Sequence, residues 1–370
     1  MTKPACRACR GERGTTVLDL GDQPPADHFP PAGDAGPDAR FALSMWWCQR
    51  CGLAQLAEDE TTTAEPRGVE PEAVVLQARA ALSLVADAGM FATRSTVLEF
   101  PSPHGGSWIQ DAAHYRLAQV SSRPADVVVD SFGIMHEADQ AAGVRRRAAA
   151  LAPGGVLLLQ YQSLDSIVRL GAWSALRHGH FAYYSLLPLQ ALLAQVGLAV
   201  VRTWDFDLYG GTVLLAVVHA DENQAVDDSV ERLEVRDREA GMTDPVALSS
   251  LQAQVDRHIG WLRRELSERR RAGRVVFGYG AASRAAALLA AAQIDATLLC
   301  GIGDASPDKH GRRMPGTDVP IVGAHDLIAA HPDDVMLFLP DLLPEVTRAY
   351  PELAGRWIPS DSTDVDHGVY

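Results

Sequence analysis

Two C-x-x-C motifs constrain this chain more than any other feature of its sequence. Cys6 and Cys9 form one pair, and Cys48 and Cys51 form the other. A turn of this spacing lets two thiolates reach one tetrahedral ion, and four sulfurs complete the closed shell of structural zinc. Redox pairs or disulfides are the alternative, which a reducing compartment disfavours. We therefore predict a zinc-binding module in residues 1–65, with a structural metal and no open catalytic position.

Composition excludes several classes of protein. The chain has 370 residues with 47% hydrophobic content, enough for two or three domains at roughly 150 residues each. Its 33 basic and 47 acidic residues give a net charge of −14, which repels nucleic acids and anionic membranes. No apolar run approaches the roughly 18 residues of a membrane span, and the polar start lacks a signal-peptide core. We expect a globular cytoplasmic protein whose partner is a small molecule, with neither nucleic acid nor membrane as a partner.

Some conspicuous residues have structural explanations. Cys300 lies alone in an apolar, strand-like run, which favours a buried core thiol over a nucleophile. The arginine runs Arg145–Arg147 and Arg269–Arg271 are typical of solvated helix faces. We expect none of these residues to carry the function.

Residues 66–220 alternate helical and strand patterns, which predicts a mainly parallel sheet covered on both faces. The tight turn Leu208–Gly211 separates two apolar runs, and a connection that short forces an antiparallel hairpin. The expected helices are 69–85, 107–120, one after residue 133 that ends in the segment 151–161, and 186–197. The expected strands are 96–100, 125–133, 198–207 and 211–220.

Residues 221–272 are charged and helical in pattern, which predicts a connector of long solvent-bridging helices, and a Rossmann-like α/β unit follows up to residue 370. Gly278, Tyr279 and Gly280 follow a strand, but Ser283 replaces the third glycine of the dinucleotide-binding fingerprint. A tight strand-to-helix turn is the alternative. Asp304 lies 24 residues after Gly280 at a strand end, near the spacing of a ribose-binding acid. At the expected helix start, a phosphate would meet Arg284.

Several markers together carry a family resemblance. The hairpin and the L-x-P-G-G-x-L-x-L segment 151–159 resemble class I S-adenosylmethionine methyltransferases. Over nearly its whole length, the chain resembles the zinc-containing C-methyltransferases of deoxysugar biosynthesis. The further markers of this resemblance are the paired C-x-x-C, the stretch 178–185, GYGAASR and GDASPDKHGRRMPGTDVPI. These enzymes add a methyl branch to a thymidine-diphosphate keto-sugar. The resemblance implies an α/β fold with three units, structural zinc, a nucleotide-sugar substrate and a role in antibiotic or other specialised metabolism.

The resemblance also implies roles for single residues. A histidine removes the ring-carbon proton in that family, and the matching stretch places it at His180, with His178 and Tyr183 beside it. Imidazole suits proton abstraction at neutral pH. Metal ligation or exposure are the alternatives for the histidines, and core packing is the alternative for Tyr183. Cofactor contacts fall on Glu99, His104 and Gly105, and substrate contacts on Arg177, Tyr209, Gly210, Gly211, Gly278, Tyr279, Gly280, Arg284 and Asp304.

The expected cofactor loop departs from the family pattern. Pro101 and Pro103 replace residues whose backbone N–H groups should meet the cofactor. From Glu99 to Asp126 there are only 27 residues, and a single crossover helix with its loops takes about 10–12 or more. No acid in this interval suits the ribose clamp, since Asp111 lies on a helix-like stretch. The sequence predicts a sheet shortened by at least one strand–helix unit and a degenerate S-adenosylmethionine site.

The catalytic stretch departs as well, because Arg177 and Gly179 stand where the family has tyrosine and glutamate. His180 then lacks an acidic neighbour in sequence, and the charge of Arg177 disfavours its protonation. We expect an enzyme of nucleotide-sugar or related keto chemistry that uses His180 for proton transfer and has lost methyl transfer. A working methyltransferase and a non-catalytic ligand-binding or partner protein are the alternatives.

Overall fold

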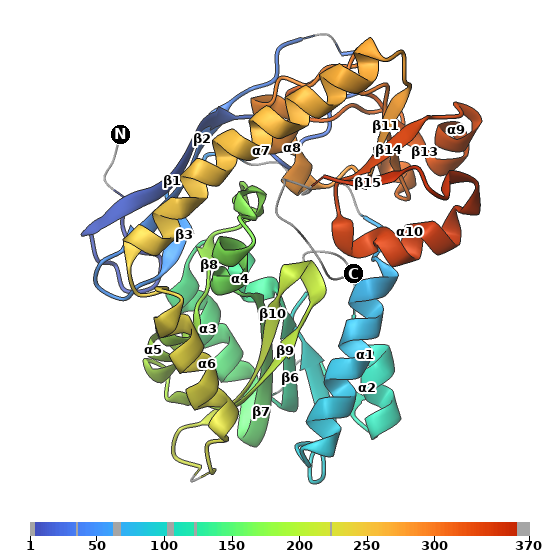
Figure 1. Ribbon diagram of the computed structural model, residues 1–370. Helices are drawn as coiled ribbons and strands as arrows, with labels where there is room; N and C mark the ends of the chain where they lie inside the picture. Colours follow the sequence, from blue (N-terminus) through green and yellow to red (C-terminus); the bar gives the residue numbers. More distant parts are fainter. Residues whose placement is uncertain are drawn as a thin grey trace.

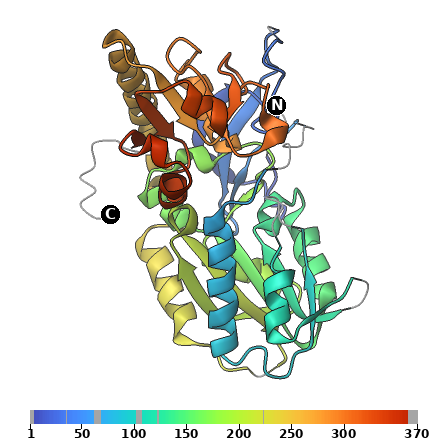
Figure 2. The same cartoon turned by 90° about the vertical axis from the view of Figure 1, so that its right-hand side faces the viewer.

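The computed structural model describes residues 4–34, 36–61, 68–101, 107–121, 124–222 and 224–360. Three sheets organise these residues. The N-terminal and C-terminal sheets lie side by side at one end of the molecule, and the central sheet lies below them (Figures 1 and 2). No helix in the described ranges is long and apolar enough to cross a membrane.

The N-terminal sheet contains a strand from a distant part of the chain. Its order is β1-β2-β3-β8, and β3 pairs antiparallel with β8. Strand β8 brings the predicted catalytic stretch onto the zinc module. The strands are β1 Gly14–Gln23, β2 Phe41–Cys48, β3 Ala54–Leu56 and β8 Ala182–Tyr183.

The central sheet has the order β5-β4-β6-β7-β10-β9. The four strands from β5 to β7 are parallel, whereas β10 is antiparallel to both β7 and β9. This confirms the predicted hairpin and the class I methyltransferase-like fold. The strands are β4 Thr96–Glu99, β5 Ala118–Gln119, β6 Ala125–Ser131, β7 Leu151–Gln162, β9 Leu198–Phe206 and β10 Thr212–His219.

The interval between β4 and β6 is shortened, as the residue count predicts. Its described residues form α2 Ile109–Ala112, one 3-10 turn and the two-residue strand β5, with no second helix or third strand. The predicted helix over 107–120 is therefore wrong in extent. Arg116 adopts a left-handed φ of 61°, which ends the helical turn, and the next residues join the sheet edge.

Helices cover both faces of the central sheet. Helix α1, Glu72–Asp87, buries Val74, Ala78, Ala81, Leu82 and Val85, which confirms the helix predicted over this segment. Four of these residues pack with alternate side chains of β6 and β7, and the remaining side chains of those strands face the other helices. The other helices are α3 Gln140–Ala150, α4 Leu164–Arg169, α5 Leu186–Ala194 and α6 Asp228–Glu239.

The C-terminal sheet is parallel and doubly wound, in the order β13-β12-β11-β14-β15. This confirms the Rossmann-like arrangement. Cys300 is exposed because β12 begins only at residue 302, so the predicted core thiol is wrong. The elements are β11 Val276–Tyr279, α8 Ser283–Ala291, β12 Ile302–Asp304, β13 Ile321–Gly323, α9 Ala324–Ala329, β14 Asp334–Leu337, α10 Leu343–Ala349 and β15 Trp357–Pro359.

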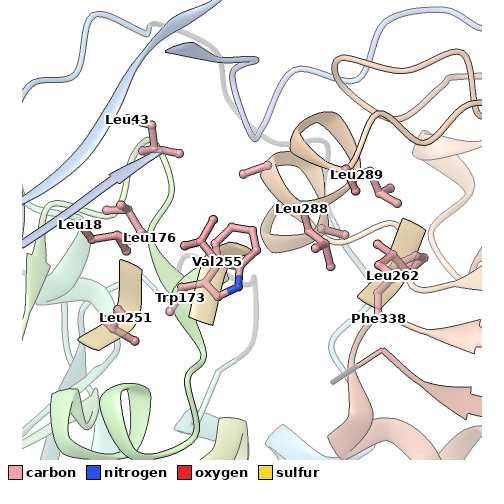
Figure 3. Packing of buried hydrophobic residues seen from close by; sticks show 14 of the residues in the cluster. Leu18, Leu43, Trp173, Leu176, Leu251, Val255, Leu262, Leu288, Leu289 and Phe338 are labelled. Atoms are coloured by element: carbon pink, nitrogen blue, oxygen red, sulfur yellow. The ribbon is translucent and has the colours of Figure 1, made fainter. Parts of the chain in front are cut away.

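The long helix α7, Pro245–Arg271, joins the N-terminal and C-terminal sheets. It runs across both of them in Figure 1. Five side chains of α7 are buried, so the predicted solvent-bridging connector is wrong for this helix. In Figure 3, Val255 lies near Trp173, and Leu262 near Phe338. The five buried residues are Leu248, Leu251, Val255, Leu262 and Leu266.

Candidate functional site

The four cysteines of the N-terminal module meet at one point. Their sulfur atoms all lie within 4.8 Å of one another, with Cys6 to Cys51 at 3.5 Å and Cys9 to Cys48 at 3.6 Å. Four sulfurs at about 2.3 Å from a tetrahedral ion are about 3.8 Å apart. All four are free thiols, which argues against disulfides. The geometry and the donor set fit structural zinc.

Matching backbone turns hold the two cysteine pairs. Arg10 and Gly52, which follow the second cysteine of each pair, have left-handed φ values of 59° and 76°. Their N–H groups donate to the carbonyl oxygens of Cys6 and Cys48 at 2.9 and 2.8 Å. This repeated turn directs each pair of sulfurs to the same side, so the shell is formed by the fold itself.

The predicted catalytic histidines lie in a buried turn. His178 and His180 are each 2% exposed, so the alternative of exposed imidazoles is wrong. The backbone N–H of His180 donates to the Arg177 carbonyl at 3.3 Å, and Gly179 between the histidines has a φ of 77°. Neither histidine belongs to a metal-binding group, since the cysteine cluster is the only such group among the described residues.

His178 packs into the zinc module. Its Nε2 lies 3.3 Å from the Ala42 carbonyl oxygen, and its ring meets the edge of Phe41. Burial lowers the pKa of His178, so the neutral imidazole is favoured. These contacts suit a residue that anchors the turn.

His180 lies between two other rings. Its ring centroid is 5.0 Å from that of His136 and 4.5 Å from that of Tyr183. The Tyr183 hydroxyl accepts the Arg177 N–H at 3.2 Å and donates to the Ala175 carbonyl at 3.2 Å. Burial raises the pKa of Tyr183, so this hydroxyl stays protonated and links Arg177 to Ala175. His136 was not predicted, because only the packing of β8 beside the turn after β6 brings it to His180.

A second cluster joins Tyr209 to two arginines. Tyr209 lies at the tip of the β9–β10 hairpin with a left-handed φ of 55°. The guanidinium of Arg284 lies over its ring, 5.0 Å from the centroid. Burial raises the pKa of Tyr209, while the positive charges of Arg284 and Arg177 oppose that rise. The sequence-predicted residues Arg177, Tyr209 and Arg284 are thus brought together from three parts of the chain.

This cluster lies where two sheets present their binding edges to each other. Ligands of open α/β sheets bind outside the carboxyl ends of the strands, where the strand order reverses. In the central sheet that point lies between β4 and β6, where Phe132 contacts Tyr209 at 5.9 Å between ring centroids. In the C-terminal sheet it lies between β11 and β14, beside Arg284 at the start of α8. The hairpin tip points towards the C-terminal sheet in Figure 1, and it contacts the turn Pro340–Leu342 that follows β14.

The paired glycines of the hairpin are required by packing. A Cβ on Gly211 would lie 2.0 Å from the Ser166 Oγ, and one on Gly210 would lie 2.5 Å from Leu170. Gly211 also has a φ of 147°. These glycines let the hairpin approach α4, which fixes the position of Tyr209.

The other predicted residues of the C-terminal unit form its strand-to-helix turn. Asp304 accepts the Ala281 N–H at 2.7 Å and the Ser306 N–H at 2.8 Å. A Cβ on Gly278 would lie 2.6 Å from Phe338, and Gly280 has a φ of 88°. The Tyr279 hydroxyl is hydrogen-bonded to the Tyr350 hydroxyl at 2.9 Å. These contacts give Gly278, Tyr279, Gly280 and Asp304 structural roles beside the crevice.

The described residues do not fit S-adenosylmethionine. Glu99 accepts the Ser107 hydroxyl at 2.5 Å and the Trp108 N–H at 2.6 Å, so both its oxygens are engaged. The Phe100 N–H donates to the Val129 carbonyl, and Pro101 has no N–H. No acid follows β5 before β6 begins. His104 and Gly105, the other predicted cofactor contacts, lie outside the described residues.

A buried arginine lies at the point between β4 and β6 where the strand order of the central sheet reverses. Arg147 is 1% exposed and forms an ion pair with Asp130, which is fully buried. Its guanidinium lies 4.4 Å from the Phe100 ring centroid and 3.3 Å from where a Cβ on Gly133 would stand. The arginine therefore lies between the segments that follow β4 and β6. The predicted solvated face is wrong for this residue, because it points inward from α3.

Comparisons with known proteins agree with this three-part architecture. A zinc binding domain model matches residues 6–64, a methyltransferase domain model 48–203, and a C-methyltransferase C-terminal domain model 207–359. The C-methyltransferase NovU of Streptomyces niveus is 23% identical over 396 residues, which cover 95% of this chain and 94% of NovU.

Two solved methyltransferase structures are similar to parts of the chain. An O-methyltransferase family protein from Burkholderia thailandensis has a TM-score of 0.29 at 16% identity, over 40% of this chain and 58% of that one. Magnesium protoporphyrin IX methyltransferase from Synechocystis PCC 6803 has a TM-score of 0.30 at 10% identity, over 40% and 84%. The cysteine cluster, the sheet order and the three domain matches together make the chain similar, along most of its length, to zinc-containing C-methyltransferases.

Proposed function

We propose that this chain acts on a nucleotide sugar or a related keto intermediate of specialised metabolism. In this proposal His180 moves a proton at the carbon beside the carbonyl, and methyl transfer from S-adenosylmethionine has been lost. The observation that carries the proposal is the Arg284–Tyr209 contact between two sheets. Arg177, at the start of the histidine turn (residues 177–180), acts electrostatically on both residues. The relative NovU supports carbon chemistry, because a C-methyltransferase must first form a carbon nucleophile.

The site has the groups that a nucleotide sugar requires. Guanidinium groups bind phosphate oxygens through paired, charge-assisted hydrogen bonds. Arg177 and Arg284 are close enough to repel each other electrostatically, and a bound diphosphate would relieve that repulsion. The Arg284 guanidinium lies over the Tyr209 ring, and the Asp341 carboxylate attracts it electrostatically. We therefore assign the diphosphate to these two arginines.

Proton transfer fits the second half of the site. The Tyr183 hydroxyl accepts the backbone N–H of Arg177 and the Tyr183 ring contacts His180, so the base and the anion-binding residue belong to one connected turn. The imidazole would take a proton from the carbon next to the substrate carbonyl, and the C–H electron pair would become an enolate. Return of the proton gives epimerisation or isomerisation, and loss of a neighbouring leaving group gives elimination. None of these steps needs a methyl donor.

Deuterium exchange tests this proposal without a known product. Zinc-loaded protein would be incubated in deuterium oxide with a panel of nucleoside-diphosphate keto-sugars, and exchange beside the carbonyl would be followed by NMR. We expect exchange with at least one substrate, its loss in His180→Gln, and its retention in His325→Gln, a control at a 95% exposed histidine. Equal exchange in His180→Gln would exclude this role for His180.

A working methyltransferase is the second candidate, favoured by the family matches and by NovU. Calorimetric titration of folded protein with S-adenosylmethionine and S-adenosylhomocysteine separates the two. Our proposal expects no saturable binding of either compound. Micromolar binding would restore methyl transfer, and a protein that also failed to bind any nucleotide sugar would be a non-catalytic scaffold.

A further inference from the structure

The contacts of the histidine turn, residues 177–180, indicate that the zinc module contributes residues to the proposed proton-transfer site. We infer that Asp59 is a positioning residue that holds this turn, and that Asp27 places a second carboxylate against it. The inference rests on the proposed role of His180. Both aspartates belong to the N-terminal module and lie far from His180 in sequence.

Asp59 holds the turn through the peptide between the two histidines. Its Oδ2 accepts the Gly179 N–H at 2.7 Å, and its Oδ1 accepts the N–H and hydroxyl of Thr61 at 2.9 and 2.7 Å. Thr61 therefore fixes the orientation of the carboxylate. The half-buried Asp59 is thus committed to this peptide and is not a freely rotating surface group.

Asp27 approaches the same glycine. Its Oδ2 lies 3.5 Å from where a Cβ on Gly179 would stand. A larger side chain at this position would extend towards the carboxylate and displace it. The φ of 77° at Gly179 also disfavours any side chain there. The absence of a side chain at Gly179 thus leaves space for the carboxylate of Asp27, which belongs to the N-terminal module.

Several charged and titratable groups act on this turn. Asp59 raises the pKa of His178, against the larger lowering caused by burial. Arg7 opposes the charge of Asp59 and stacks on Phe181, which follows His180. His136 and Tyr183 contact the His180 ring, and Arg177 begins the turn. The two aspartates are the negative groups of this set, so they offset Arg177 and make the buried histidines better bases.

Histidine NMR tests this inference without any substrate. His180 is assigned in the isotope-labelled, zinc-loaded protein by comparison with His180→Gln, and its titration is then followed in variants. Asp59→Asn and Asp27→Asn remove the charge but keep an oxygen acceptor, and each should lower the pKa of His180 by about 0.5 or more. Asp22→Asn, at an exposed aspartate of the same module, should leave it unchanged.

A second measurement isolates the positioning role. Asp59→Ala removes the acceptor, so exchange of the Gly179 amide with solvent should accelerate at least tenfold, whereas Asp59→Asn should preserve its protection. Zinc content is measured for every variant to confirm an intact module. Unchanged His180 titration in both asparagine variants would overturn the inference. Failure of the deuterium-exchange assay with normal NMR results would instead overturn the proposed function alone.

Discussion

The guanidinium of Arg284 lies 5.0 Å from the centre of the Tyr209 ring, and this contact joins the C-terminal sheet to the hairpin of the central sheet. Each residue lies at the binding edge of its own sheet. A ligand between them would touch both domains at once. The proposed site therefore depends on the assembly of the two sheets.

We expect Arg284→Ala to weaken binding of nucleoside diphosphates by at least about tenfold, because a charge-assisted hydrogen bond contributes roughly 1.5–3 kcal/mol. Isothermal titration with uridine and thymidine diphosphates measures the effect. Arg264→Ala, at an exposed arginine of the neighbouring helix α7, is the matched control and should bind as the wild type does. Equal affinities for the two variants would contradict the assignment of the diphosphate.

Removal of zinc should disorder the N-terminal module, because the metal supplies the stability that ties its two cysteine turns together. Cys48→Ser should reduce the metal content from about one ion per chain to near zero. Metal analysis and amide exchange of residues 4–56 check both effects. Cys300→Ser changes an exposed cysteine outside the cluster and should retain the full metal content. A metal-free wild-type protein with unchanged amide protection would refute a structural zinc.

Arg147→Met should destabilise the protein by roughly 3–5 kcal/mol, because it leaves Asp130 buried without its partner. Denaturant unfolding measures this loss. Arg146→Met removes the adjacent, 52% exposed arginine and should cost no more than about 1 kcal/mol. The double variant Asp130→Leu with Arg147→Met should recover most of the stability, and equal losses in both single variants would argue against a buried pair.

Asp237 makes stability depend on pH. Burial raises its pKa to about 6 from 3.8, although its Oδ2 accepts the Leu186 N–H at 2.6 Å. The folded state therefore favours the protonated acid, and the full contribution of this acid to the free energy of unfolding is present below pH 4. This contribution declines as pH rises through about 6, by about 3 kcal/mol in total. Denaturant unfolding from pH 4 to 8 should show this loss in the wild type relative to Asp237→Asn. Asp228→Asn, at an exposed residue of the same helix, should retain the wild-type slope.

The sequence alone determined the features that depend on short distances along the chain. Two C-x-x-C motifs predicted the zinc cluster, because each turn brings its own sulfurs together. The turn at 208–211 predicted the β9–β10 hairpin, since so short a connection allows no crossover. Counting 27 residues between Glu99 and Asp126 predicted the missing strand–helix unit, because the backbone has a fixed length per element.

Only the tertiary structure decided the features that depend on packing between distant segments. Arg147 lies in a charged run, yet α3 turns it inward to Asp130, which no local pattern specifies. Helix α7 is rich in charge but buries one stripe against two sheets. The sequence left His180 without an acid, whereas the fold brings Asp59 to the adjacent glycine. Asp59 and Gly179 are 120 residues apart, and they meet only when the zinc module has packed against the histidine turn, so their contact follows from the three-dimensional arrangement of the domains.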